Sequence, residues 1–352
     1  MSDAFRELLK KVGSGVHTGK DLSRQEAAAA ARMILLQEAT PAQIGAFMIA
    51  HRIKRPTSAE LAGMLDTYDE LGPKLQPWGM GNAPAVTVLG TPYDGRSRTA
   101  PVTPLTALVL SAAGVPVVMH GGDLMPTKYG VPLIAIWQGL GVDFSTLTLA
   151  QVQQLLATTG LGFVYLPQHF PAAYGIVPYR DQIGKRPPTA TLELIWSPYA
   201  GDAYIVAGYV HPPTEILFRE TFALRGGTNF TLVKGLEGSC DLPRDRTAII
   251  AVSKPDASEG FERLLLHPRD YGFEGKEVPL DSTSELLEQM QAVLNGESSE
   301  LMLTAIWNGG FYLWRCGICP DLPTGFAKAK ALFTEGLAQK KLVEIQQAIA
   351  SI

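Results

Sequence analysis

Apolar residues in the first part of the chain recur at helical spacing. On one face of the first segment they lie three or four positions apart, at Phe5, Leu8, Leu9 and Val12. Capping boxes, which mark the starts of helices, follow at positions 23–26, 40–43 and 57–60. The last of these helices is predicted to stop at Gly72-Pro73. The pattern therefore predicts four helices and a small all-α domain.

From residue 85 the chain alternates between short apolar runs and helical patterns. A strand is predicted over 86–89, and Gly90 ends it. A polar loop leads to a helix over 105–113, with Thr103 as its N-cap and Pro104 in its first turn. A second strand is predicted over 115–119. Strand, helix and strand in this order form a βαβ unit, which predicts parallel pairing and a right-handed crossover.

The remaining pattern continues this alternation and defines the fold class. Further strands are predicted over 162–166, 203–210, 229–233 and 248–252, and further helices over 132–140, 149–158, 213–224, 282–294, 300–314 and 323–349. The stretch 167–198, rich in proline and aromatic residues, is expected to cross back toward the helical domain. We predict an α/β fold with a mostly parallel central sheet. Its domains are a small N-terminal all-α domain, residues 1–73 joined by part of 167–198, and a larger α/β domain, residues 74–352.

Composition narrows the function classes. The net charge of −4 and the pI of about 5.9 exclude a global attraction to nucleic acid, so a polyanion site must be a local basic patch. No apolar run approaches the roughly 18 residues that a membrane span needs, so no membrane association is expected. Three cysteines make no disulfide framework, which favours a cytoplasmic location.

The loops after the first two strands carry the candidate chemistry. Both leave the carboxyl edge of the predicted sheet, where ligands bind in such folds. The loop 90–103 offers bare backbone, hydroxyls and guanidinium groups that suit phosphate. Its candidate ligand-binding residues are Gly90, Thr91, Asp94, Gly95, Arg96, Arg98 and Thr103. The second loop adds Gly121, Thr127 and two candidate catalytic residues, His120 and Lys128. The alternatives are an ordinary solvated loop and a structural histidine at a strand end.

The order of several motifs resembles that of the anthranilate phosphoribosyltransferase family over nearly the whole chain. They are the four N-terminal helices, the loop 90–95, His120-Gly121, the run 178–182, the turn 235–238 and the run 267–273. The resemblance implies a nucleoside phosphorylase/phosphoribosyltransferase fold and phosphoribosyl pyrophosphate (PRPP) as a ligand. It also implies Mg²⁺ as a cofactor and a homodimer formed through the helical domain. Arg180 matches the arginine that contacts anthranilate, and Lys128 matches a lysine after the second loop.

Three motifs depart from this family. In active members the first loop reads Gly-Thr-Gly-Gly-Asp and its backbone wraps the pyrophosphate, whereas here Pro92 and Tyr93 replace the middle glycines. Lys-His-Gly-Asn-Arg becomes the run 119–123, which loses two cations and an amide. The magnesium-binding Asp-Glu pair becomes Glu237-Gly238. The chain thus looks like a divergent branch of the family, some members of which bind nucleic acid.

Other features each allow two interpretations. A nucleic-acid patch of basic residues near two tyrosines is one reading of Arg180, Lys185 and Arg186. An exposed crossover segment is the other. Glu237, with Asp241 nearby, either holds Mg²⁺ together with substrate phosphates or belongs to a charged turn. Cys316 and Cys319 have metal-ligand spacing, but no second pair completes a site, so we expect no metal or redox role.

Two functional hypotheses follow. The first is a binding protein whose interdomain cleft holds a phosphorylated ribose or a nucleic-acid polyanion, with anthranilate transfer lost or weak. The second is an active magnesium-dependent phosphoribosyl- or glycosyltransferase acting on anthranilate or another acceptor. Phosphorolysis of a nucleoside ranks last, because it needs a tight phosphate pocket that Pro92 would spoil.

Overall fold

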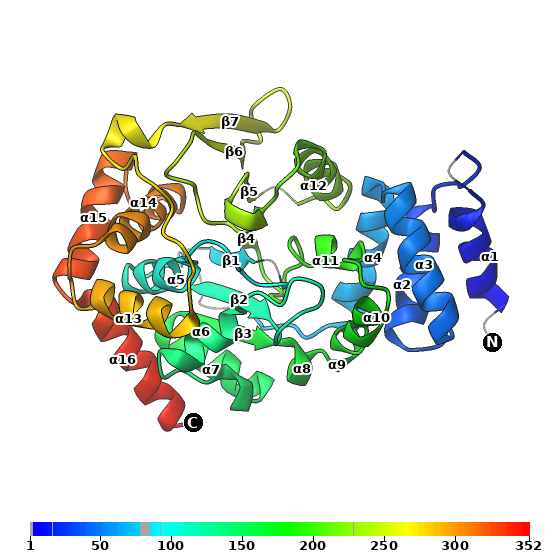
Figure 1. Cartoon of the computed structure of the whole chain (residues 1–352), viewed down its shortest axis with the longest axis horizontal. Coiled ribbons are helices and arrows are strands. Elements are labelled where there is room, and N and C mark those ends of the chain that lie inside the picture. The colour runs from blue at the N-terminus through cyan, green and yellow to red at the C-terminus, as the bar shows by residue number, and fades with distance from the viewer. Residues whose placement is uncertain (1–2, 16, 78–84, 92, 228) are drawn as a thin grey trace.

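The helical lobe at the N-terminus consists of four helices. The computed structural model describes residues 3–15, 17–77, 85–91, 93–227 and 229–352, so Pro92 lies outside the described residues. The lobe contains α1 (Asp3–Gly13), α2 (Arg24–Leu35), α3 (Pro41–Lys54) and α4 (Ser58–Leu71) (Figure 1). All three predicted capping boxes are present at the starts of α2, α3 and α4, which confirms these helix starts.

The larger lobe is built on a seven-stranded sheet with the order β3-β2-β1-β4-β5-β6-β7. Its strands are β1 (Val86–Gly90), β2 (Val117–Gly121), β3 (Leu161–Tyr165), β4 (Ala203–Gly208), β5 (Phe230–Val233), β6 (Ala248–Ser253) and β7 (Phe261–Leu266). β1 to β5 are parallel, and β6 and β7 run antiparallel. The predicted fold class is confirmed. β7 was not predicted, because its side chains alternate poorly and it lies half exposed at the sheet edge.

Helices cover the sheet and close the chain. They are α5 (Thr103–Ala112), α6 (Leu133–Gly139), α7 (Leu149–Thr159), α12 (Pro212–Leu224), α13 (Thr283–Leu294), α14 (Glu300–Arg315), α15 (Leu322–Thr334) and α16 (Leu337–Ala350). The prediction of one helix over 323–349 is wrong, since Gly336 adopts a φ of 71° between α15 and α16. Thr103 is likewise not an N-cap: Val102 precedes the helix, and the Thr103 hydroxyl donates instead to Asp241 over 2.9 Å.

The segment between β3 and β4 joins the two lobes. It forms the short helices α8 (Leu166–His169), α9 (Pro171–Tyr174), α10 (Val177–Gln182) and α11 (Thr189–Leu192), next to the helical lobe (Figure 1). Phe170 and Trp196 pack edge-on against Tyr68 of α4, with ring centroids 5.3 and 5.9 Å away. The helical lobe and the segment therefore share one hydrophobic core.

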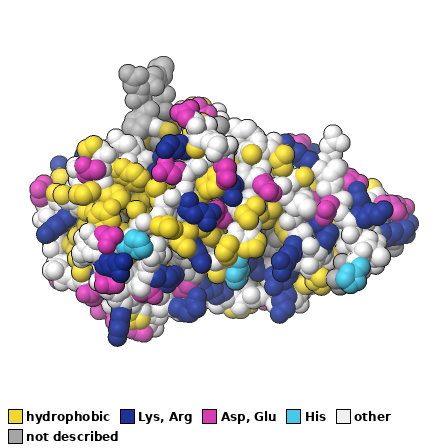
Figure 2. Space-filling view, turned by 90° about the horizontal axis from the view of Figure 1, so that it is seen from above, with side chains coloured by type: hydrophobic (Ala, Val, Ile, Leu, Met, Phe, Trp, Pro, Cys, Tyr) yellow, Lys and Arg dark blue, Asp and Glu magenta, His cyan; other side chains and the backbone are white. Residues whose placement is uncertain are grey.

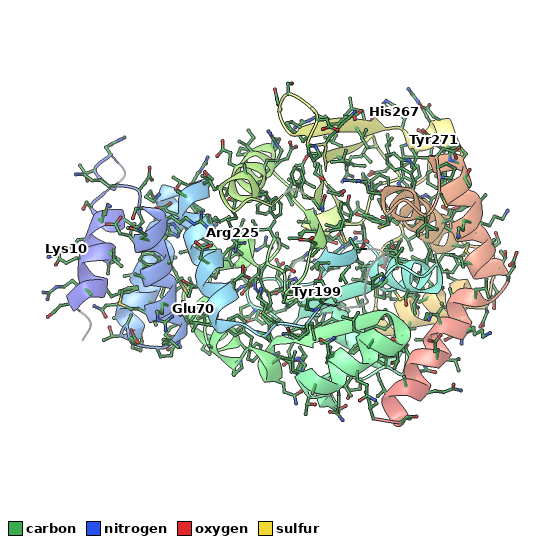
Figure 3. The ribbon with its side chains drawn as sticks, turned by 180° about the vertical axis from the view of Figure 1, so that it is seen from behind. Lys10, Glu70, Tyr199, Arg225, His267 and Tyr271 are labelled. Carbon is green, nitrogen blue, oxygen red and sulfur yellow. The ribbon has the colours of Figure 1, made fainter. Side chains whose placement is uncertain are left out.

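An ion-pair cluster ties α12 to the helical lobe. Arg225, labelled in Figure 3, lies just after α12. It faces Asp66 of α4 at 3.1 Å and also pairs with Asp69. Arg24 of α2 binds the same Asp66 at 2.6 Å. Within the part of the chain that the structure describes, no helix is long and apolar enough to cross a membrane.

Candidate functional site

The glycines of the donor loop, residues 90–103, serve close backbone contacts. A Cβ atom on Gly90 would lie 2.1 Å from the carbonyl oxygen of Leu194, so the crossover segment rests directly on the end of β1. Gly95 has a φ of +71°, and a Cβ there would lie 2.3 Å from the carbonyl oxygen of Gly130. Both positions therefore need glycine for packing, and their predicted contact with phosphate stays a prediction.

The donor loop wraps around one carboxylate, that of Glu237. Glu237 lies in the short 3-10 helix η2 (Leu236–Gly238) after β5, with a φ of 53°. Its oxygens accept hydrogen bonds from three successive backbone N–H groups, at 3.2, 3.0 and 3.1 Å, and from two hydroxyls of the same loop residues. These residues are Ser97, Arg98 and Thr99. Successive N–H groups that converge in this way form an anion-binding nest, and here the anion belongs to the protein.

Three cations surround the same carboxylate. Lys128 forms an ion pair with it, Arg96 Nε lies 3.3 Å away, and Arg98 Nε lies 3.7 Å away. Burial would raise the pKa of Glu237, but the hydrogen bond and charge of Lys128, together with Arg96, hold that pKa well below its ordinary value. Glu237 is therefore ionised in the folded protein. Its side chain is only 3% exposed.

Arg96 is fully committed to neighbouring groups. Its Nη1 donates to Asp241 over 2.7 Å and to Ser239 over 2.8 Å. Asp241 also accepts from the backbone N–H of Val102, so it closes the start of α5. The space left beside Arg96, Thr91 and Thr103 amounts to about 20 Å³, room for about one water molecule. As it stands, this space excludes the pyrophosphate of a donor.

The remaining loop candidates are spread between interior and surface. Lys128 donates to the carbonyl of Gly95 over 2.8 Å, and burial lowers its pKa while Glu237 partly restores it. Arg98 is 77% exposed, and Thr127 is exposed. Asp94 is buried and pairs with Arg186 from the crossover segment. The structure thus brings Arg96, Arg98 and Lys128 together around Glu237.

His120 lies inside an aromatic cluster. Its Nδ1 shares a hydrogen bond with the hydroxyl of Tyr93, and its ring packs edge-on against Tyr93 and Trp196, at centroid distances of 5.4 and 5.2 Å. The side chain is completely buried, and burial lowers the pKa of His120 to about 3. His120 is therefore neutral at physiological pH. Gly121 next to it is also buried at the end of β2. This is the geometry of a structural histidine.

Arg180 is buried next to a second carboxylate. It is 4% exposed, and its Nε and Nη2 have no hydrogen-bond partner among the described residues. The nearby Glu193 accepts a hydrogen bond of 2.9 Å from Tyr68. Burial raises the pKa of Glu193 to about 7, although Tyr68 and the charge of Arg180 pull it down. The cavity between them measures about 10 Å³, too small for an aromatic acid.

The predicted nucleic-acid patch does not form as a unit. Lys185 and Arg186 are exposed, but Arg180 is buried and cannot contact a polymer in this arrangement. Arg180 is therefore not part of a surface patch. The physical reason is that Arg180 faces inward from α10 toward the shared core. Figure 2 shows basic and acidic side chains interspersed over the face that it draws.

The site does not fit a magnesium ion as it stands. The oxygens of Glu237 and Asp241 are taken up by N–H groups, hydroxyls and guanidinium groups, which leaves no pair of free carboxylates for Mg²⁺. Among the described residues no group of three His, Cys, Asp or Glu side chains is placed to hold a metal. Cys316 lies 3.4 Å from the hydroxyl of Thr87, and burial raises the pKa of its thiol to about 11.

Sequence reasoning missed Glu193, Trp196 and Ser239. Glu193 had a detectable signal, because it is the only charged residue in the apolar run 192–196. Trp196 and Ser239 carried none, since their roles depend on side chains that lie far away in the sequence.

The comparisons with known proteins agree with this architecture. Residues 6–72 match the model described as the glycosyl transferase family helical bundle domain, and residues 82–339 match that of the glycosyl transferase family a/b domain. The chain belongs to this family.

Within the family the chain is anthranilate phosphoribosyltransferase-like. It is 28% identical to the anthranilate phosphoribosyltransferase of Chromobacterium violaceum, covering 93% of this chain and 94% of that protein. It is also 28% identical to the anthranilate phosphoribosyltransferase of Rhizobium meliloti, covering 97% of this chain and 99% of that protein. The Saccharomyces cerevisiae enzyme, in a structure with PRPP and Mg, has a TM-score of 0.84 at 17% identity, covering 100% of this chain and 99% of that one. The structure of the Thermus thermophilus enzyme has a TM-score of 0.80 at 22% identity, covering 99% of this chain and 100% of that one. At these identities the structural matches concern the fold.

Proposed function

We propose that this protein binds a phosphorylated ribose or related polyanion at the donor loop and that its transfer of phosphoribosyl groups to anthranilate is lost or weak. The observation that carries the proposal is the carboxylate of Glu237 inside the nest of Ser97, Arg98 and Thr99. These N–H groups and the cations around them attract an anion. A tethered carboxylate has a high effective concentration there, so a phosphate binds only by displacing it.

The weak transfer follows from what the reaction requires. Departure of pyrophosphate needs positive charge and donors aimed at the leaving oxygens. Here Arg96 and Lys128 are already paired with the carboxylates of Asp241 and Glu237, and the two cavities beside Arg96 and Arg180 hold about 20 and 10 Å³. His120, neutral and enclosed, offers no proton to a bound ligand.

The test is a direct assay of the purified protein with anthranilate, PRPP and Mg²⁺, next to the Chromobacterium violaceum enzyme as a positive control. We expect turnover far below one per second, the lower end of ordinary enzyme rates. Calorimetric titration with PRPP should give weak binding, because Glu237 competes. Ordinary turnover would overturn the proposal and favour the alternative, an active magnesium-dependent transferase.

An active transferase remains the second candidate, favoured by relatives that cover nearly the whole chain and are named as such enzymes. Binding of nucleic acid would rest on the exposed Lys185 and Arg186, and affinity that does not fall with salt would contradict it.

We further propose a cytoplasmic homodimer formed through the helical lobe. Leu36 and Ile53 of this lobe are 42% and 64% exposed, which supports a partner surface there. Sedimentation at micromolar concentration should give twice the chain mass, and a monomer would contradict the dimer.

A further inference from the structure

A second cleft, much larger than the space at the donor loop, lies between the two lobes. It encloses about 930 Å³, within the range of sites for small-molecule ligands. Its walls are the end of α3 with the start of α4, the residues 186–191 of the crossover segment, and the start of α12. None of its described lining residues belongs to the donor loop.

The cleft carries an excess of positive charge. Arg52, Arg55 and Arg186 line it, against one acidic side chain among its described lining residues, Glu220. No carboxylate of the described chain forms an ion pair with Arg52 or Arg55. This contrasts with the donor loop, where each arginine faces Glu237. Arg52 and Arg55 therefore remain available to an external anion, whereas Arg186 already pairs with Asp94.

The backbone holds these arginines in place. Nη1 of Arg52 donates to the carbonyl oxygen of Arg186 over 2.9 Å, which holds the Arg52 guanidinium against the backbone of the crossover segment. The Arg186 side chain is 42% exposed, and its partial burial, followed by the charge of Arg52, lowers its pKa. Arg55 follows α3 with a φ of 69°, which directs the chain sharply at the helix end. Like charges held together in this way are stabilised when an anion binds between them.

Prolines and aliphatic side chains form much of the rest of the wall. Prolines line it from two sides, at positions 187–188 and 212–213, and Ile216 beside them is 48% exposed. Four hydroxyl side chains also line the cleft, those of Thr57, Ser58, Thr191 and Thr214. Guanidinium groups next to a proline-lined surface suit a ligand that joins phosphates to a planar ring. An inorganic ion would leave most of this volume unfilled.

We propose that this cleft binds a nucleotide, with its phosphates at Arg52 and Arg55 and its base against the proline wall. The site is distinct from the donor loop and goes beyond the function proposed above. Arg186 also pairs with Asp94, so it links the cleft to the donor loop.

The experiment is calorimetric titration of the full chain with ATP in the presence of a chelator, so that the phosphates stay uncoordinated. ATP should bind, triphosphate should bind more weakly, and adenosine should give no heat. The double variant Arg52→Ala/Arg55→Ala should bind ATP at least tenfold more weakly. Both side chains are exposed, so the fold should be retained, which the unfolding midpoint checks.

Two control variants keep the result interpretable. Arg246→Ala/Arg269→Ala removes the same charge from exposed positions elsewhere and should leave ATP affinity unchanged. Arg98→Ala alters the donor loop and should also leave it unchanged. Three results would each overturn the nucleotide site. They are an ATP affinity of Arg52→Ala/Arg55→Ala equal to that of the wild type, no heat with millimolar ATP, and binding of single-stranded oligonucleotides alone. The assay with PRPP and anthranilate reports on the donor loop separately.

Discussion

Glu237 and Glu193 are two buried carboxylates with opposite electrostatic surroundings. Glu237 accepts hydrogen bonds from three backbone N–H groups and faces three cations, so its pKa is held far below the ordinary value. Glu193 has one hydroxyl donor, Tyr68, and the charge of Arg180, so burial dominates and its pKa rises to about 7. Burial alone therefore does not decide the charge of a carboxylate. The number of donors aimed at it does.

The two groups should affect stability with opposite signs. Glu237 stabilises the fold above the unfolded pKa of about 4.5, and this contribution is lost as the pH falls toward its folded pKa. Glu193 keeps its proton in the folded state up to about pH 7, whereas the unfolded chain loses it near 4.5. Ionisation of Glu193 therefore lowers stability as the pH rises between these values.

The largest effect is expected from Glu237→Gln. The variant removes the carboxylate charge that Lys128 and Arg96 share, while Arg96 keeps Asp241, and breaking a buried ion pair costs about 3 kcal/mol of unfolding free energy. Urea unfolding at pH 7 measures this. Inorganic pyrophosphate should then raise the melting temperature of the variant more than that of the wild type, because the nest is free.

Glu297→Gln, at an exposed position, is the matched control and should change neither quantity. A loss of stability no larger in Glu237→Gln than in this control would mean that water satisfies the nest as well as the carboxylate does.

Glu193→Gln should change the pH dependence more than the stability at low pH. The wild type is expected to lose about 3 kcal/mol of unfolding free energy between pH 4.5 and 7.5 through this group. The unfolding free energy of the variant should depend on pH less steeply by that amount, which urea unfolding at several pH values measures. Identical slopes in the two proteins would show that Glu193 is ionised throughout.

Tyr68→Phe tests the single donor of Glu193. Loss of this hydrogen bond should cost about 1 kcal/mol and raise the pKa of Glu193 further, so the decline in stability extends above pH 7. The control is Tyr129→Phe, whose hydroxyl bonds to Asp181 at an exposed position. An unchanged upper limit of the decline would contradict the assigned role of Tyr68.

The smallest effect is expected from Arg98→Ala. The side chain is 77% exposed and 3.7 Å from Glu237, while the backbone N–H that binds Glu237 is kept. The melting temperature should stay within about 1 °C of the wild type. A larger fall would place the third cation on a par with Arg96.

The pattern of local contacts explains how far the sequence allowed prediction. Helix starts were predictable where the cap and its partner lie three residues apart, as at Thr57 and Glu60. The start of α5 was not, because its cap comes from Asp241, 138 positions beyond Thr103. The same distance hid the role of Glu237: the sequence offered it as a metal ligand or a charged turn. Only the folded chain brings it into the loop at 97–99.

Helix α12 connects the two lobes and also forms part of the cleft lined by Arg52, Arg55 and Arg186. Its beginning forms one wall of the cleft, and its far end is held to α2 and α4 through Arg225 and Arg24. With thirteen residues at about 1.5 Å of rise each, α12 is about 20 Å long. Added salt screens these ion pairs, so raising the ionic strength should loosen the end of α12 that lies away from the cleft.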